Sequence, residues 1–150
     1  MIRPALSNSL RAAAAFLCLA APVAASETLE TYFMSIGPND LTNSSGARLE
    51  TFAQQVQQDR ANYHRFGRAD PADEGDRIFG NRQARASIPA LLSAPGGNGG
   101  NWSRDSGGRV NFADYLVSVC GRNGRATHMI VTYADGDGHD TCEGYVGAGN

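Results

Sequence analysis

Acidic, basic and imidazole side chains are grouped in QQDRANYHRF, residues 57–66. Residues four apart are neighbours on a helix, so Asp59 would lie beside Tyr63 and Arg60 beside His64. Such a group could perform acid–base chemistry on a phosphate or carbonyl substrate, as in a small secreted hydrolase. The alternative is a structural ion pair, because charges that interrupt a buried stripe usually neutralise one another. We favour that alternative and keep Asp59, Arg60 and His64 as catalytic candidates.

His128 is the other candidate for acid–base chemistry. It begins the apolar run HMIVTY, and a lone histidine in a strand is more often a hydrogen-bonded core or interface residue than a catalytic group. Glu143 and an arginine would complete a set that is similar in type to small secreted ribonucleases, in which a helix packs on an antiparallel sheet. That similarity is one of architecture only, and no motif supports it.

The end of the chain, ADGDGHDTCEGYVGAGN, contains three aspartates that could bind calcium. An EF-hand register fails, because its first and twelfth positions would be Tyr133 and Gly144. The stretch GDGHDT resembles part of a glycine-rich β-roll repeat, but such repeats bind calcium between stacked turns, and one unit cannot build a site. We therefore expect a solvated acidic turn and keep three metal-ligand candidates: Asp135, Asp137 and Asp140.

Two cysteines follow residue 25, Cys120 and Cys142. In an oxidising compartment an even pair favours a disulfide, and this pair lacks the CxxC spacing of a zinc or redox site. Closing a loop of about 20 residues would stabilise the fold by roughly 3 kcal/mol. A straight strand from Asp140 would keep the sulfur atoms too far apart. We therefore expect the acidic turn to bend the chain back toward Cys120.

Residues 1–25 have the pattern of a secretory signal peptide, with two arginines, an apolar run and small residues before Ser26. The run is about ten residues, roughly half of the ~20 that span a bilayer, so we expect export to the periplasm or cell exterior without a membrane span. Removing Arg3 and Arg11 leaves 11 arginines, no lysine and 15 acidic residues, a net charge of −4. This balance argues against nucleic-acid binding, and we expect no cofactor.

Residues 47–66 have the spacing of a long amphipathic helix. We expect Ser44 or Ser45 to cap its start and Gly67, in the left-handed conformation, to end it. Asp59 and Arg60 interrupt the stripe where another apolar residue is expected. The apolar positions follow one another at steps of three, four, seven and three: Leu49, Phe52, Val56, Tyr63 and Phe66.

Three further segments are less regular. Residues 29–36 fit a helix face or a strand equally well. Residues 81–92 predict a shorter helical region, which Pro89 divides or restarts with Ser87 as the cap. Residues 95–108 contain six glycines and predict a long mobile loop, in which Trp102 could contact a partner.

The final third changes to a period of two. Two β-rich runs surround Asn123-Gly124, which is a strong signal for a hairpin. A two-residue turn would place Cys120 opposite Thr127 and Val119 opposite His128. Because both faces of this hairpin are largely apolar, we expect it to be central, either with helices on one side and chain or loop on the other, or with further strands beside it.

Helices followed by an antiparallel sheet predict an α+β fold. We expect one small domain over residues 26–150, with the long helix (about 47–66) and a shorter helical region packed on a sheet built on the 110–134 hairpin. No catalytic motif stands out. The sequence therefore favours a binding or interaction module for a protein or small-molecule partner, with a small secreted hydrolase and a calcium-dependent module as alternatives.

Overall fold

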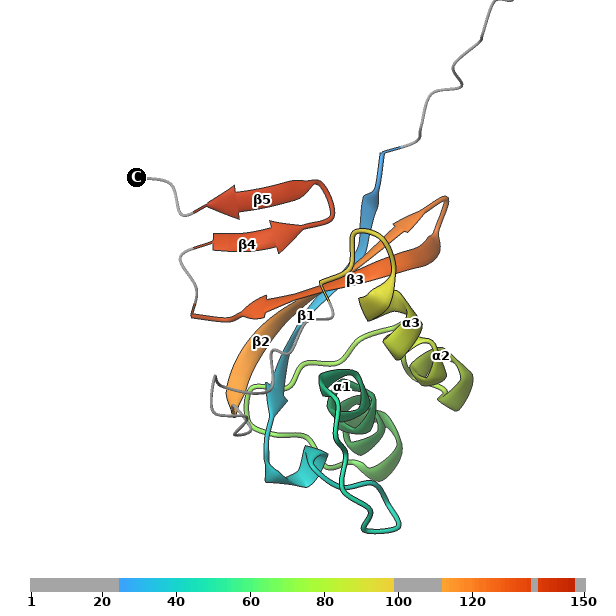
Figure 1. Cartoon of the computed structure of the whole chain (residues 1–150), viewed down its shortest axis with the longest axis vertical. Helices are drawn as coiled ribbons and strands as arrows, with labels where there is room; N and C mark the ends of the chain where they lie inside the picture. Colours follow the sequence, from blue (N-terminus) through green and yellow to red (C-terminus); the bar gives the residue numbers. More distant parts are fainter. Residues whose placement is uncertain (1–24, 99–111, 136–137, 148–150) are drawn as a thin grey trace, which may run out of the picture.

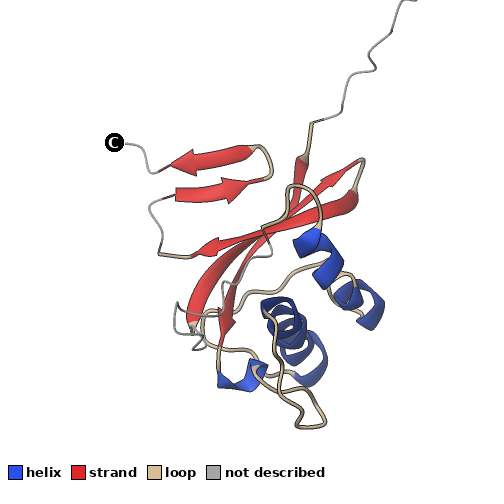
Figure 2. Ribbon diagram, viewed as in Figure 1, coloured by secondary structure: helices blue, strands red, loops and turns tan. Residues whose placement is uncertain are grey.

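The computed structural model describes residues 25–98, 112–135 and 138–147. Helices cover one face of a three-stranded antiparallel sheet, and a two-stranded hairpin lies on the opposite side (Figures 1 and 2). The predicted α+β class is confirmed. The sheet has the order β1 (Glu27–Ile36), β2 (Ala113–Arg122), β3 (Arg125–Tyr133), and the hairpin consists of β4 (Gly138–Thr141) and β5 (Gly144–Gly147).

Strand β1 settles the ambiguity of residues 29–36. Its side chains alternate across the sheet, so Tyr32, Met34 and Ile36 are buried beneath the helices while Phe33 is 40% exposed on the other face. The buried residues join one core between helices and sheet, whose other members come from all parts of the described chain: Phe52, Val56, Phe79, Ile88, Leu91, Leu92, Tyr115, Val117, Val119, Met129 and Val131.

Strands β2 and β3 form the predicted hairpin. Asn123 and Gly124 both have positive φ, 52° and 71°, as a tight two-residue turn requires. The predicted register is wrong beyond the first two pairs, because a β-bulge shifts it between Gly121 and Cys120. Cys120 lies opposite His128 rather than Thr127. The extra residue, Thr127, moves every later β3 side chain to the other face.

Helix α1 (Phe52–Ala61) continues into η2 (Asn62–Phe66), a turn of π-helix. Gly67 ends it with a φ of 61°, as predicted, but the predicted long helix from residue 47 is wrong, because the helical segment begins at Phe52. Thr51 and Gln54 form a capping box there, and the Asn43 side-chain oxygen accepts hydrogen bonds from the N–H groups of residues 45 and 47. These bonds close residues 43–47 into a turn, so neither Ser44 nor Ser45 caps the helix.

The second helical region is divided into α2 (Arg82–Ala86) and α3 (Ile88–Ser93). The break at Ser87 agrees with the effect expected of Pro89. The Ser87 hydroxyl does not cap α3, as we had considered, but donates to the Ala84 carbonyl at 2.7 Å. A short helical turn, η1 (Pro38–Asp40), follows β1.

Irregular segments bond to both outer strands of the sheet. Beside β1, Glu74 N donates to Phe33 O at 2.9 Å and Ser35 N donates to Asp73 Oδ1 at 2.8 Å. Beside β3, the Asn98 amide bonds both the N–H and the C=O of Val131, each at 2.7 Å. The glycine-rich segment is therefore held at its beginning, which the sequence did not predict. Its residues 99–108, with Trp102, and the leader residues 1–24 lie outside the described residues.

The predicted disulfide joins Cys120 to Cys142, with Cα atoms 5.2 Å apart. Cys142 lies at the turn between β4 and β5, so the chain does bend back along β3 after residue 135. Cys120, Ile130 and Cys142 form a second, smaller apolar cluster. The disulfide thus holds the β4–β5 hairpin against the sheet face that the helices do not cover.

Candidate functional site

Arg60 is the centre of a buried ion cluster between α1 and the loop after it. Its guanidinium is fully buried and donates from Nε to Asp59 Oδ2 at 2.6 Å. Its Nη1 donates to the Glu74 carbonyl at 2.8 Å and to Asp76 Oδ2 at 3.3 Å. Its Nη2 lies 3.6 Å from Asp73 Oδ1. Arg60 therefore fixes the loop that bonds to the edge of β1.

The electrostatics of this cluster favour a structural role. Burial raises the pKa of Asp59 well above its usual value. Burial also opposes the charge on Arg60, but Asp59, Tyr32 and Asp73 together outweigh it and raise the pKa of that guanidinium. The Tyr32 ring adds a cation–π contact, 4.6 Å from the Arg60 carbon to the ring centroid. The charge of Arg60 is thus matched within the fold.

Of the three catalytic candidates on this helical segment, His64 is partly exposed, with 14% of its side chain accessible to solvent. Its Nε2 lies 2.7 Å from Asp76 Oδ2, while Asp76 Oδ1 accepts the N–H groups of Ile78 and Phe79. Burial alone would raise the pKa of Asp76, but the bonds from His64 and Phe79 lower it below its usual value. Asp76 orients the His64 ring, and catalysis by His64 stays a prediction.

Sequence reasoning missed Asp73 and Asp76, the two loop carboxylates of the cluster. They belong to DPADEGD, residues 70–76, whose Asp70-Pro71 start has the pattern of a helix cap and a short acidic turn. The sequence did contain a signal for these partners. Arg60 occupies a position of the helix where an apolar residue is expected, and several carboxylates follow that helix. A buried guanidinium needs acidic or carbonyl partners.

His128 lies apart from this cluster, on the sheet face of Cys120. It is buried beside Gly96, where an added Cβ would lie only 3.1 Å from the ring. Thr127 Oγ1 lies 3.0 Å from its Nδ1. Burial, and then the nearby Arg122, lower the pKa of His128. The structure therefore does not bring the two candidate histidines together.

The three calcium-ligand candidates are only partly described. Asp135 is exposed in the turn after β3, and Asp140 belongs to the backbone of β4. Asp137 lies outside the described residues. Among the residues whose side chains the structure describes, which exclude 138–140 and 144–147, no three His, Cys, Asp or Glu side chains are grouped to hold a metal ion.

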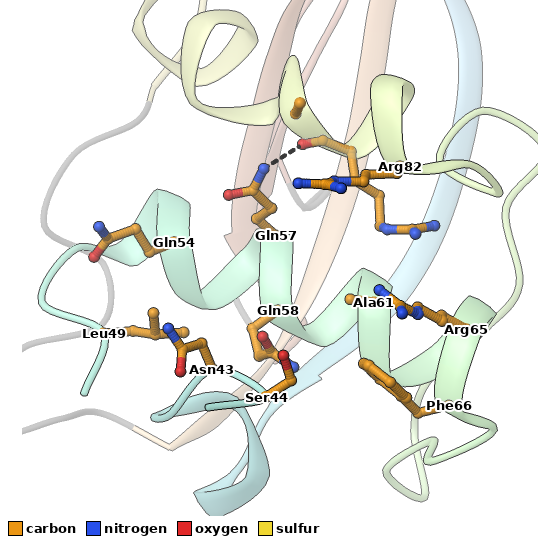
Figure 3. A pocket seen from close by; sticks show the side chains of 12 residues that line it. Asn43, Ser44, Leu49, Gln54, Gln57, Gln58, Ala61, Arg65, Phe66 and Arg82 are labelled. Atoms are coloured by element: carbon orange, nitrogen blue, oxygen red, sulfur yellow. Dashed lines mark hydrogen bonds between the residues drawn. The ribbon is translucent and has the colours of Figure 1, made fainter. Parts of the chain in front are cut away.

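A groove that the sequence analysis did not predict runs along the outer side of α1. Its volume is about 530 Å³, within the usual range of ligand sites, and the 43–49 turn and α2 form its walls (Figure 3). The α1 and η2 residues that line it lie three and four apart on one helical face: Gln54, Gln57, Gln58, Ala61, Arg65 and Phe66. Polar residues at this spacing were the signal in the sequence that one face of the helix is not packed against the core.

Internal hydrogen bonds fix two of the glutamines that line this α1 groove. Gln57 Nε2 donates to the Arg85 carbonyl at 3.0 Å, the dashed bond in Figure 3. Gln54 Oε1 accepts from the backbone N–H groups of Glu50 and Thr51 at 2.9 and 3.1 Å. Because a carbonyl only accepts and an N–H only donates, the orientation of each amide is determined. Gln57 thus presents an oxygen to the groove and Gln54 presents an NH₂ group.

Two arginines supply positive charge at one end of the α1 groove. Figure 3 shows Arg65 and Arg82 on the same side, with Phe66 next to Arg65 and Gln54 at the opposite end. Both arginines are exposed, and neither forms an ion pair with a carboxylate in the described part of the chain. The Phe66 ring is 38% exposed. This end of the groove can hold an anionic group beside an aromatic face.

A second hollow, of about 640 Å³, lies where β2 begins and β3 ends. Asp114 and Asp135 make its described walls acidic, and Phe112 lies at its border. It adjoins residues 99–111 and 136–137, about which the structure says nothing. The α1 groove, which α1, α2 and the 43–49 turn form, is therefore the better candidate site.

No protein-family model, curated protein or solved structure matches this chain. Among the described residues, no helix is both long and apolar enough to cross a lipid bilayer.

Proposed function

We propose that this chain is an exported binding module whose α1 groove holds an anionic ligand. The observation that carries the proposal is the pair Arg65 and Arg82, which lie in one groove without carboxylate partners among the described residues. The whole chain has 15 acidic residues and 13 basic ones. Two unmatched guanidinium groups in an acidic chain favour an external acidic partner.

Arginine suits such a ligand better than lysine would. Its planar fork can donate two parallel hydrogen bonds to one carboxylate or phosphate, which fixes the orientation of the ligand as well as its position. The neighbouring glutamines are already held by backbone groups, so little side-chain entropy is lost when they bond to a ligand. The site is thus partly organised before binding.

Export rests on the leader-like residues 1–25 and agrees with the Cys120–Cys142 disulfide, because disulfides persist in oxidising compartments. An exported binding module would meet acidic polymers of an envelope or of the surroundings of the cell. A net charge near −4 for residues 26–150 would repel most polyanions, so recognition would depend on the local charge of the groove.

The test is binding of fluorescent polyanions by the processed, disulfide-bonded chain. Three probes of equal charge, an oligoglutamate, an oligogalacturonate and a polyphosphate, are titrated and followed by fluorescence anisotropy. We expect at least one to bind, and the double variant Arg65→Gln with Arg82→Gln to weaken it about tenfold or more, since charge-assisted bonds are lost.

Arg125→Gln is the matched control, because Arg125 is exposed on the β2–β3 turn and does not line the groove. It should leave the affinity unchanged. The proposal is wrong if none of the three probes binds, or if the double variant binds the best probe as tightly as the parent chain does.

A further inference from the structure

Gln58 lies in the middle of the α1 groove, and a series of hydrogen bonds determines which end of its amide is free. Asn62 Nδ2 donates to Asp40 Oδ1 at 2.9 Å and to the Asn39 carbonyl at 3.2 Å. The oxygen of Asn62 therefore accepts from Gln58 Nε2, at 2.9 Å. Gln58 Oε1 is left as an acceptor that faces the groove.

The free polar atoms of the groove thus include both acceptors and donors. Gln57 and Gln58 present oxygens, whereas Gln54 presents an NH₂ group. Asn43 also presents an NH₂ group, because its oxygen accepts from the backbone N–H groups of residues 45 and 47 at 3.0 and 2.9 Å. Ser44 adds a hydroxyl, which can do either. A fitting ligand must therefore offer both donors and acceptors.

This mixture discriminates between anionic ligands. A phosphate or sulfate ester offers mainly acceptors. These suit Arg65 and Arg82, but they provide no donor for the oxygens of Gln57 and Gln58. A sugar hydroxyl both donates and accepts, and a sugar carboxylate suits an arginine fork. Arg65 lies over the Phe66 ring, 5.0 Å from its centroid, and the part of this ring that is exposed offers a flat apolar surface for the C–H face of a sugar ring.

A smaller hollow adjoins the α1 groove at Phe66. Its volume is about 290 Å³, and it shares Phe66 and Gln58 with the α1 groove. Arg68 lines it, so each of the two hollows that share Phe66 has an arginine in its lining. A ligand that spans the two hollows would need negative charge on more than one of its units.

A peptide fits this surface less well. Peptides that bind as added strands use a free sheet edge, and peptides that bind as helices use an apolar groove. The walls of the α1 groove are helices and a turn, and its lining is polar at most positions.

We propose that the ligand of the α1 groove is an acidic oligosaccharide with a carboxylate on its sugar rings, bound across Phe66. The inference rests on the proposed function and adds the chemical class of the ligand. In this arrangement Arg65 and Arg82 bind a carboxylate, while the oxygens of Gln57 and Gln58 accept ring hydroxyls. Asn62 and Asp40 act as positioning residues, because they determine the orientation of Gln58.

The experiment compares labelled tetragalacturonate with tetraglutamate, with a polyphosphate of the same charge, and with methyl-esterified tetragalacturonate. We expect the acidic sugar to bind at least tenfold more tightly than the other three. Gln57→Met with Gln58→Met keeps the side-chain volume but removes both oxygens. This variant should lower tetragalacturonate affinity about tenfold and leave polyphosphate affinity unchanged, because polyphosphate offers almost no hydrogen-bond donors to those oxygens.

Gln83→Met is the control, since Gln83 is exposed on α2 and does not line the groove. Melting curves verify that each variant is folded. If tetraglutamate or polyphosphate binds as tightly as the acidic sugar, the sugar class is wrong while the anion-binding function stands. If the methyl ester binds equally well, the carboxylate is not recognised and the inference is wrong. If no acidic probe binds, both proposals are wrong.

Discussion

The helical segment formed by α1 and η2 carries two arginines with opposite surroundings. Arg60 is fully buried and bonds to Asp59 and Asp76, whereas Arg65 is exposed and lies over the Phe66 ring, 5.0 Å from its centroid. The chain that follows α1 supplies carboxylates to one side of the helix, and the other side has mainly glutamines. The same residue type is thus structural where carboxylates pack against it and free to contact a ligand where none do.

The largest effect should come from removing the buried member of this pair. Arg60→Met leaves Asp59, Asp73 and Asp76 without their cation, and breaking a buried ion pair from one side typically costs about 3–5 kcal/mol. We expect a loss of this size in the free energy of unfolding, measured by urea denaturation. The loop beside β1 should also become a site of early proteolysis, because Arg60 no longer holds the Glu74 carbonyl.

Arg65→Met is the matched substitution on the other side of the helix. Because Arg65 is exposed, this change should alter the free energy of unfolding by less than about 0.5 kcal/mol. Equal losses for Arg60→Met and Arg65→Met would contradict the contrast between the two arginines.

The second effect concerns the sheet face opposite the helices. Cys120→Ala with Cys142→Ala opens a link across a sequence separation of 22, for which the chain-entropy relation gives about 3 kcal/mol. We expect a loss of this size in urea denaturation. Ligand affinity of the α1 groove should not change, since the hairpin is attached to the other face of the sheet. A parallel loss of affinity would show that the two regions are coupled.

The smallest effect is a pH dependence that originates in Asp40. Burial raises the pKa of Asp40 to about 6 from 3.8, so the folded chain retains a proton that the unfolded chain releases. Stability should therefore fall as the pH rises through this window, by about 2 kcal/mol between about pH 4.5 and about pH 7. Burial shifts Asp59 and Asp70 in the same direction.

Asp76 opposes this trend only at lower pH, because its lowered pKa gives stability that is lost as the pH falls below about 4. Urea denaturation across the pH range measures the slope, and Asp40→Asn should reduce it. Stability that instead increases from about pH 4.5 to about pH 7 would rule out Asp40 as the dominant group. The same variant disturbs the Asn62 amide, so it should also weaken binding in the α1 groove.

Local signals predicted much of the fold. The Asn123-Gly124 turn and the Cys120–Cys142 disulfide follow from residue types whose conformation or pairing is strongly restricted. The register failed because the bulge at Thr127 depends on how the two strands twist, and a single extra residue exchanges the two faces. The helix start failed because Ser44, Ser45 and Thr51 are all suitable caps, and the turn around Asn43 decides among them.

The candidate site was less accessible from sequence. A structural ion pair in this part of the helix was expected, but Asp76 follows Arg60 by 16 positions, and no periodicity connects them. The polar residues at helical spacing along one side of α1 were a signal for the α1 groove that our sequence analysis did not use. Its opposite wall, with Arg82, depends on how α2 packs against α1, which is a tertiary property that a single sequence does not display.

The bonds that the 73–74 loop and Asn98 make to the outer strands have a consequence for behaviour at high concentration. Exposed strand edges are templates on which strands of other copies assemble into aggregates. Here Ser35 N bonds to Asp73, and both backbone polar groups of Val131 bond to Asn98. These side chains block the pairing of a further strand at each edge, so growth of a fibre from either edge would first require local unfolding. Substitutions at Asp73 or Asn98 would expose the chain to self-assembly before they altered any ligand contact.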